Sequence, residues 1–63
     1  MTDIITALDK LRCVERELKM RRNVYPRWIE KGNISVGKAA HEIAAMEAIV
    51  ADYKKLAEDE RLI

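Results

Sequence analysis

With 63 residues, one cysteine (Cys13) and one histidine (His41), the chain can form neither an internal disulfide nor an ordinary Cys/His zinc site, so we expect no metal and no cofactor. Because a single domain below about 70 residues usually needs a support of this kind, association with a partner subunit is the support that remains. The net charge of +1 conceals a basic middle, with a local charge of +5 over residues 10–31 and of −2 over residues 32–63.

The first predicted helix extends from about residue 3 to residue 31. Thr2 or Asp3 would cap its N-terminus, since both side chains can accept hydrogen bonds from the first free backbone N–H groups. Positions at alternating spacings of four and three are then mostly apolar, which is typical of a helix that packs along one seam. Glu15 and Arg22 fill two of these positions, and the others are Ile4, Leu8, Leu11, Leu18, Tyr25 and Ile29.

Pro26 interrupts this helix, because proline has no backbone N–H and disfavours helical geometry in the residue before it. Two interpretations are open. The helix could kink at Pro26 and continue to Lys31, which the continuation of the seam to Ile29 favours. Alternatively, it could stop near Val24, with Pro26 as the first residue of a separate short turn.

The sequence Gly32-Asn33 predicts the end of the first helix, since glycine adopts the left-handed conformation that commonly follows a helix C-terminus. We expect a loop over residues 32–35, with Ser35 as the N-cap of a second helix over about residues 36–60. One apolar stripe of this helix comprises Val36, Ala40, Ile43, Met46, Val50, Tyr53 and Ala57. A second stripe, about 100° away, comprises Ala45, Ile49, Leu56 and Ile63.

Two long helices and one short loop predict an all-α fold, a single antiparallel helical hairpin over residues 1–63. A lone hairpin cannot cover a second helix that is apolar on several sides, so we expect a dimer that forms a four-helix bundle, or a higher oligomer. The predicted interface consists of Leu18, Met20, Val24, Ile43, Met46, Ile49, Val50, Tyr53 and Leu56. The alternative is that Met20 and Val24 only cover the edge of the hairpin.

The sequence offers little for catalysis, and we predict a protein that is not an enzyme. Ser35 and His41 form the only Ser–His combination, and no third group is placed by spacing to complete a site. Cys13 is expected to be an inert residue on a helix surface or in an interface, and His41 is expected to be solvated.

The segment over residues 19–31 is the predicted binding surface, because it combines arginines, which match phosphate and carboxylate groups, with aromatic rings that can stack. The predicted contact residues are Arg21, Arg22, Tyr25, Arg27, Trp28 and Lys31. A secondary basic stripe on the same helix comprises Arg12, Arg16 and Lys19. The alternative is a solvated basic face, with Tyr25 and Trp28 in the core.

This segment carries a resemblance. The residues Met20-Arg21-Arg22 and Tyr25-Pro26-Arg27-Trp28, followed by Gly32 and Ile34-Ser35 and by the pattern of the second helix, resemble a group of short proteins encoded by phages and prophages of proteobacteria. The resemblance covers roughly residues 15–55. That family has no established activity, so it implies a phage accessory context, such as interference with host defence, and carries over no binding residue.

We therefore expect an oligomeric binding protein that holds an anionic ligand, either a nucleotide signal or a nucleic acid. A protein–protein inhibitor or adaptor that docks on a host protein through apolar helix faces is the alternative, and a structural assembly component is the third hypothesis. No apolar run approaches about 18 residues and no secretory signal is visible, so we expect a cytoplasmic protein that does not bind membranes.

Overall fold

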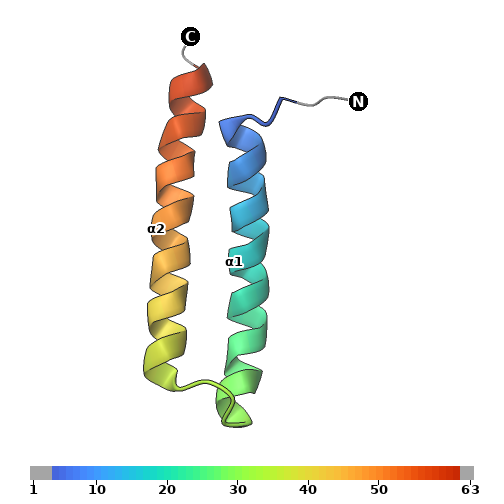
Figure 1. Cartoon of the computed structure of the whole chain (residues 1–63), viewed down its shortest axis with the longest axis vertical. Coiled ribbons are helices and arrows are strands. Elements are labelled where there is room, and N and C mark those ends of the chain that lie inside the picture. The colour runs from blue at the N-terminus through green and yellow to red at the C-terminus, as the bar shows by residue number, and fades with distance from the viewer. Residues whose placement is uncertain (1–3, 62–63) are drawn as a thin grey trace.

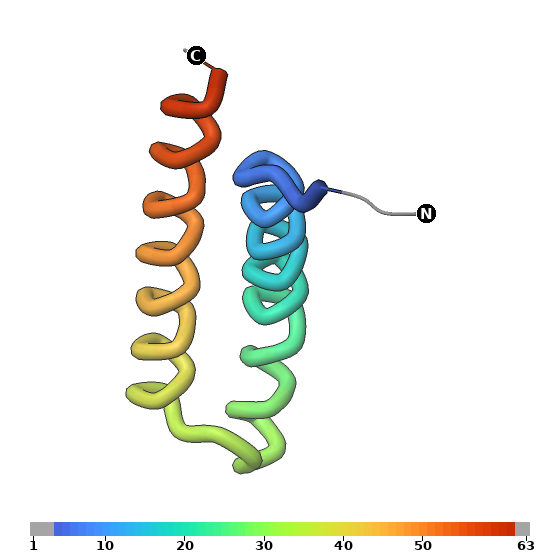
Figure 2. Tube along the Cα trace, turned by 45° about the horizontal axis from the view of Figure 1, so that its top comes forward, coloured from blue at the N-terminus to red at the C-terminus, as the bar shows by residue number. Residues whose placement is uncertain are grey.

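The computed structural model describes residues 4–61 and shows two antiparallel helices joined by one short connection. Helix α1 spans Ala7–Glu30 and helix α2 spans Val36–Arg61. They lie side by side in both views, with the loop at one end and the first turn of α1 beside the last turns of α2 at the other (Figures 1 and 2). The predicted helical hairpin is therefore confirmed. Neither of the two helices is both long and apolar enough to cross a membrane.

Helix α1 begins later than predicted, and Thr6 is its cap. The Thr6 hydroxyl accepts a hydrogen bond from the backbone N–H of Asp9 at 3.1 Å, and the Asp9 carboxylate accepts one from the backbone N–H of Thr6 at 3.1 Å. This reciprocal capping box satisfies two N–H groups that the helix cannot satisfy itself. A start at residue 3 is therefore wrong, because Ile4 precedes the cap and is 84% exposed. The predicted caps Thr2 and Asp3 lie outside the described residues.

Helix α1 passes through Pro26 without a break and ends four residues later. The interpretation in which the helix stops near Val24 is therefore wrong. The proline still has a local effect, since it has no N–H to donate to the carbonyl group of Arg22.

The C-terminus of α1 ends as the sequence predicts, at a left-handed glycine. Gly32 has a φ of 79°, and its N–H donates to the Ile29 carbonyl at 3.0 Å. The N–H of Asn33 donates to the Trp28 carbonyl at 2.8 Å, and these two bonds form a Schellman motif. The Ser35 hydroxyl then accepts from the N–H of Lys38 at 3.0 Å, which confirms Ser35 as the cap of α2.

The buried residues form a narrow line between the two helices. Helix α1 contributes Ala7, Leu11, Leu18 and Tyr25, whereas α2 contributes only the two alanines Ala39 and Ala57. The predicted seam is thus correct from Leu11 to Tyr25, but Ala7 occupies the place expected for Ile4 and Leu8. On α2, Ile43, Met46, Val50 and Tyr53 are half-buried as predicted, whereas Val36 and Ala40 are exposed.

The open end of the hairpin is joined by a contact between residues 53 positions apart. The carboxylate oxygens of Glu60 lie 3.2 and 3.3 Å from the backbone nitrogen of Ala7, and accept a hydrogen bond from its N–H. A carboxylate is favourable at this place because the N-terminus of a helix carries a partial positive charge. Around it, Val50 and Tyr53 pack against the cluster of Ala7, Leu11 and Ala57.

Candidate functional site

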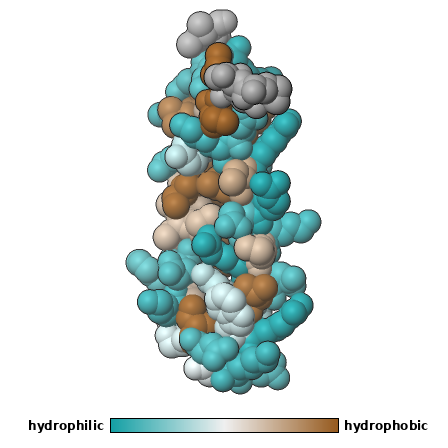
Figure 3. Space-filling view, turned by 45° about the vertical axis from the view of Figure 1, so that its right-hand side comes forward, coloured by the Kyte–Doolittle hydropathy of each residue, from teal (hydrophilic) through white to brown (hydrophobic). Residues whose placement is uncertain are grey.

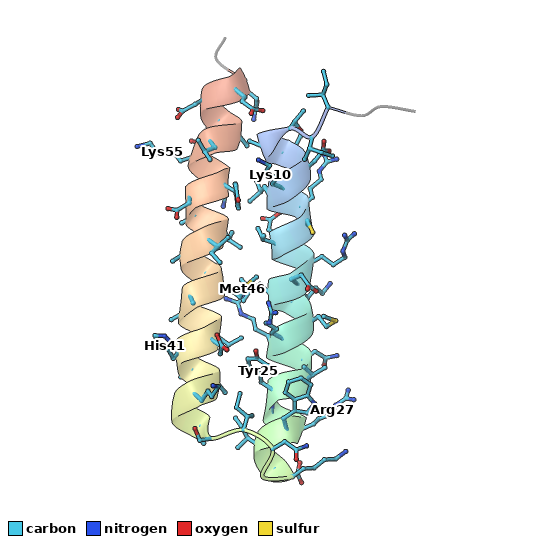
Figure 4. All side chains as sticks on the ribbon, viewed as in Figure 1. Lys10, Tyr25, Arg27, His41, Met46 and Lys55 are labelled. Atoms are coloured by element: carbon cyan, nitrogen blue, oxygen red, sulfur yellow. The ribbon has the colours of Figure 1, made fainter. Side chains whose placement is uncertain are left out.

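A basic stripe runs along the outer side of α1, with Lys19 at its margin toward α2. It is formed by the exposed residues Arg12, Arg16, Lys19, Asn23 and Arg27, which follow one another at spacings of three or four residues. Such spacings place side chains on one side of a helix. The side chain of Arg27 points away from α2 (Figure 4). Part of the stripe, Arg16, Lys19 and Asn23, lines a shallow hollow of about 400–600 Å³ together with Met20 and Arg22.

Between residues 12 and 27, one exposed acidic residue, Glu15, lies beside this stripe and lines the same hollow as Lys19. Glu15 and Glu17 lie on the same helix, but their positions place them toward α2 or its flank, and Glu17 is half-buried. The secondary stripe of the sequence prediction, Arg12, Arg16 and Lys19, is therefore a continuous cationic surface that extends to Arg27. Its exposed side chains can contact an anion.

Arg22 is engaged within the hairpin. Its guanidinium forms an ion pair with the Glu47 carboxylate of α2, and both side chains are about half exposed. A pair in this setting contributes little to stability, but it neutralises the charge of Arg22 and directs the side chain toward α2. The sequence prediction does not include Glu47. Counting outward from the loop would have placed it only to within about one helical turn, since residue 22 is 9 positions before residue 31 and residue 47 is 12 positions after residue 35.

Tyr25 is in the core and not on a binding surface. Its side chain is 8% exposed and points toward α2 (Figure 4), with its ring centroid 5.4 Å from that of Trp28 at an interplanar angle of 39°. The prediction that Tyr25 stacks on a ligand does not fit this burial. The alternative interpretation of the aromatic pair, that both belong to the core, holds for Tyr25 only, because Trp28 is 44% exposed.

The remaining predicted contact residues lie on other sides of α1. Trp28 follows Arg27 directly, and successive helical residues point about 100° apart, so the two side chains do not share one surface. Arg21 is half-buried, seven residues before Trp28 and thus on the same side as the indole. Lys31 is the exposed C-cap residue. The single basic–aromatic surface expected from the sequence is thus divided into separate parts.

The predicted interface residues are also unevenly placed. Leu18 is buried inside the hairpin, and Val24, Ile43, Met46, Val50 and Tyr53 are half-buried. Met20, Ile49 and Leu56 are large apolar residues that remain exposed. Leu18 therefore belongs to the contact within the chain, and the exposed residues are those available to a partner.

Two grooves flank the line of contact between the helices. At the loop end, a groove of about 300–500 Å³ is lined mainly by apolar residues, among them Pro26, Ile29, Val36 and Ile43. Near the open end, on the opposite side, a groove of similar size is lined by Cys13, Val14, Tyr53 and three others. There the Lys10 ammonium lies 5.9 Å from the centre of the Tyr53 ring, within the range of a cation–π contact.

The chemistry-bearing residues singled out in the sequence lie apart from one another. Cys13 is exposed on α1, and His41 points away from α1 on the outer side of α2 (Figure 4). Over residues 4–61, no group of three or more His, Cys, Asp and Glu side chains is arranged to hold a metal ion. The pKa of Asp9 is held below its usual value, mainly by the backbone N–H of Thr6 and then by the Thr6 hydroxyl, which is an effect of helix capping.

The chain matches no family model, no curated protein and no solved structure. The resemblance to short phage and prophage proteins therefore stays a prediction, and the function has to be inferred from the geometry of residues 4–61.

Proposed function

We propose that this protein is a non-enzymatic binding protein that associates with itself and holds an anionic ligand along the basic stripe of α1. One observation carries the proposal. Arg12, Arg16, Lys19 and Arg27 are exposed in a row along a single helix, and Glu15, which lines the same hollow as Lys19, is the acidic residue at the margin of that row. Arginine and lysine in such a row offer donors and positive charge to successive phosphates.

The length of the stripe favours a nucleic-acid strand over a small nucleotide. Residues 12 and 27 are 15 positions apart, which is about 22 Å along a helix at 1.5 Å per residue. Four charges spread over that distance suit a polyanion, whereas a mononucleotide would contact only one or two of them. We further propose that two hairpins assemble into a four-helix bundle and that α1 is kinked at Pro26. The proposed setting is an accessory role for a phage in the cytoplasm of a bacterial host.

The test is a titration of labelled single-stranded DNA, duplex DNA and a cyclic dinucleotide at about 50 and 200 mM salt. If the four cations release counterions from a single strand, the logarithm of the affinity falls with a slope of about −3 against the logarithm of the salt concentration, or about 50-fold over this range. Arg16→Ala/Lys19→Ala should weaken binding and lower this slope by about half.

The matched control is Lys54→Ala/Lys55→Ala, which removes the same charge from exposed residues of α2. Lys55 points to the outer side of α2, away from the stripe (Figure 4). Equal losses in the two double variants would show that only net charge matters. No binding of any of the three probes at low salt would refute the proposal.

A second candidate function is docking on a host protein as an inhibitor or adaptor. The exposure of Trp28 and Met20, at 44% and 51%, favours it, because large exposed aromatic and thioether side chains are common anchors of protein interfaces. Trp28→Ala would then abolish binding to the partner, whereas changes in the basic stripe would mainly alter its association rate. A structural assembly component, the third hypothesis, would instead form large, concentration-dependent oligomers.

A further inference from the structure

The shape of the hairpin indicates a missing second layer. Its extents of 46 × 26 × 12 Å are those of a single layer of two helices, whereas stable domains consist of at least two packed layers. The accessible surface is 5242 Å², compared with about 4,200 Å² expected for a compact monomer of this mass. The difference of roughly 1,000 Å² is close to the area of about 800 Å² that each partner buries in a standard protein interface.

The two broad faces of the layer differ in what they could bury. The Arg22–Glu47 ion pair and Lys19 occupy the middle of one face. The other, which we call the Trp28 face, carries Val14, Val24 and Trp28 of α1 beside Met46, Ile49 and Leu56 of α2. Glu17 and Arg21 of α1 lie on this face too. Ile49 and Leu56 are 38% and 49% exposed. In Figure 3, hydrophobic residues recur along the length of the molecule, with hydrophilic residues between and around them.

The Trp28 face is complementary to itself when one copy is turned over. Within the hairpin, residues at the same level have numbers that add up to about 68, as Arg22 and Glu47 or Ala7 and Glu60 do. Consider a twofold axis that crosses both helices at the level of residues 19 and 49, which satisfy this sum. Helix α1 then lies antiparallel on α1 of the second copy, and α2 on α2.

In this register, several apolar and several oppositely charged residues meet, although Leu56 of α2 meets Glu42 and Met46 meets Asp52. Two α1 residues, one from each copy, face each other when their residue numbers add up to 38. Val14 therefore meets Val24 of the second copy, and Glu17 meets Arg21. Lys10 likewise meets the indole of Trp28, a favourable cation–π pair. On α2, the sum is 98, so Ile49 meets itself on the axis. Lys38 and Glu60, of opposite charge, meet at the ends of the interface.

We propose that the Trp28 face binds a second copy of this chain in this antiparallel, twofold arrangement, which specifies the self-association of the proposed function. The interface is isologous, so each pair occurs twice and one surface serves both partners. The basic stripe of α1 stays outside it. In the dimer, the second copy covers the Trp28 indole. Trp28 then belongs to the interface and not to the binding surface that the sequence predicted for it.

Cysteine cross-linking tests the proposal directly, in a Cys13→Ser background that removes the native thiol. Ile49→Cys places two thiols across the axis, and mild oxidation at micromolar concentration should give a covalent dimer at least ten times faster than the matched control. That control is Ala51→Cys, which places the thiol on an exposed part of α2 turned away from the Trp28 face. Equal rates for the two variants, or no dimer from Ile49→Cys, would overturn the proposal.

A second experiment fixes the register and does not depend on Ile49. Val14→Cys and Val24→Cys variants, each in the Cys13→Ser background, should form a disulfide-linked heterodimer when mixed, and at least ten times less homodimer when each is oxidised alone. Homodimers in preference to the heterodimer would place the axis elsewhere and refute this arrangement.

Failure of the dimer is distinguishable from failure of the ligand proposal, because the stripe and the Trp28 face lie on different sides of α1. The same DNA titration should be carried out on the oxidised Ile49→Cys dimer and on its reduced form. Retained DNA binding without cross-linking overturns the dimer alone. Cross-linking without DNA binding overturns the ligand proposal alone.

Discussion

The two ends of the hairpin are held in different ways. At the loop end, the capping hydrogen bonds join residues within a few positions of one another: the Schellman hydrogen bonds over residues 28–33 and the Ser35 cap of α2. Packing of Tyr25 and Ala39 between the helices adds to them. At the open end, the Thr6–Asp9 capping box is also local, but Glu60 reaches the N-terminus of α1 across 53 positions. The loop end therefore forms from local sequence, whereas the open end requires that the helices first align.

This difference teaches where a small hairpin is vulnerable. The loop keeps the first end closed by chain connectivity, so its interactions mainly set the angle and register of the helices. The open end has no such link, and it depends on the small cluster of Ala7, Leu11 and Ala57 with Val50 and Tyr53. We expect separation of the helices to begin there, and variants at both ends can test that expectation.

The largest effect is expected for Leu11→Ala, which removes the largest buried side chain of the open-end cluster. The loss of buried surface and the cavity left behind should lower the free energy of unfolding by about 2 to 5 kcal/mol, measured by urea unfolding at fixed protein concentration. The control is Leu8→Ala, which removes the same atoms from a side chain that is 40% exposed. An equal cost for both variants would contradict the placement of the cluster.

At the loop end, Gly32→Ala tests the left-handed turn that ends α1. A Cβ atom meets no steric contact there, but the φ of 79° is strained for any residue with a side chain, so we expect a loss of about 1 to 2 kcal/mol. Gly37→Ala, within the first turn of α2, should instead stabilise the protein by about 0.5 to 1 kcal/mol. The midpoints of thermal unfolding of the two variants should therefore shift in opposite directions. Shifts of the same sign would contradict the left-handed conformation of Gly32 or the helical conformation of Gly37.

The long-range contact is tested by Glu60→Ala. It removes the acceptor of the Ala7 N–H and the favourable charge at the start of α1, so we expect a loss of about 0.5 to 1 kcal/mol and faster amide exchange in the first turn of α1. Asp59→Ala removes the same charge one residue earlier, from an exposed side chain, and serves as the control. If Asp59→Ala costs as much as Glu60→Ala, the contact contributes nothing of its own.

The smallest effect concerns pH. Because the folded protein holds the pKa of Asp9 below 3.8, the unfolded chain binds the proton more readily, and stability falls as pH drops. The contribution of Asp9 to the free energy of unfolding is fully present above the pKa of Asp9 in the unfolded chain, and it is lost as the pH falls through its pKa in the folded protein. The loss of stability on acidification should therefore be shallower in Asp9→Asn than in the parent. An identical pH dependence of the two would contradict the capping role of this carboxylate.

Much of the fold could be predicted from the sequence because its signals are local. Gly32 has the conformation that the end of a helix requires, Ser35 caps α2, and the predicted extent of α2 differs from the observed one by a single residue. Apolar spacing places the start of α1 too early because Ile4 continues the apolar pattern. The spacing of apolar residues does not by itself show at which residue a helix begins. The Thr6-x-x-Asp9 pattern is the signal that would have corrected this.

The sequence by itself determined that this chain forms two helices, where they turn, and that α1 carries a basic side, because caps, glycine geometry and helical periodicity act over a few residues. Only the tertiary structure decided which residues share a surface. Tyr25 and Trp28 lie close in sequence, yet packing against α2 buries the first and leaves the second exposed. Arg22 is drawn to Glu47 for the same reason, since the distance between the helices determines which charges meet.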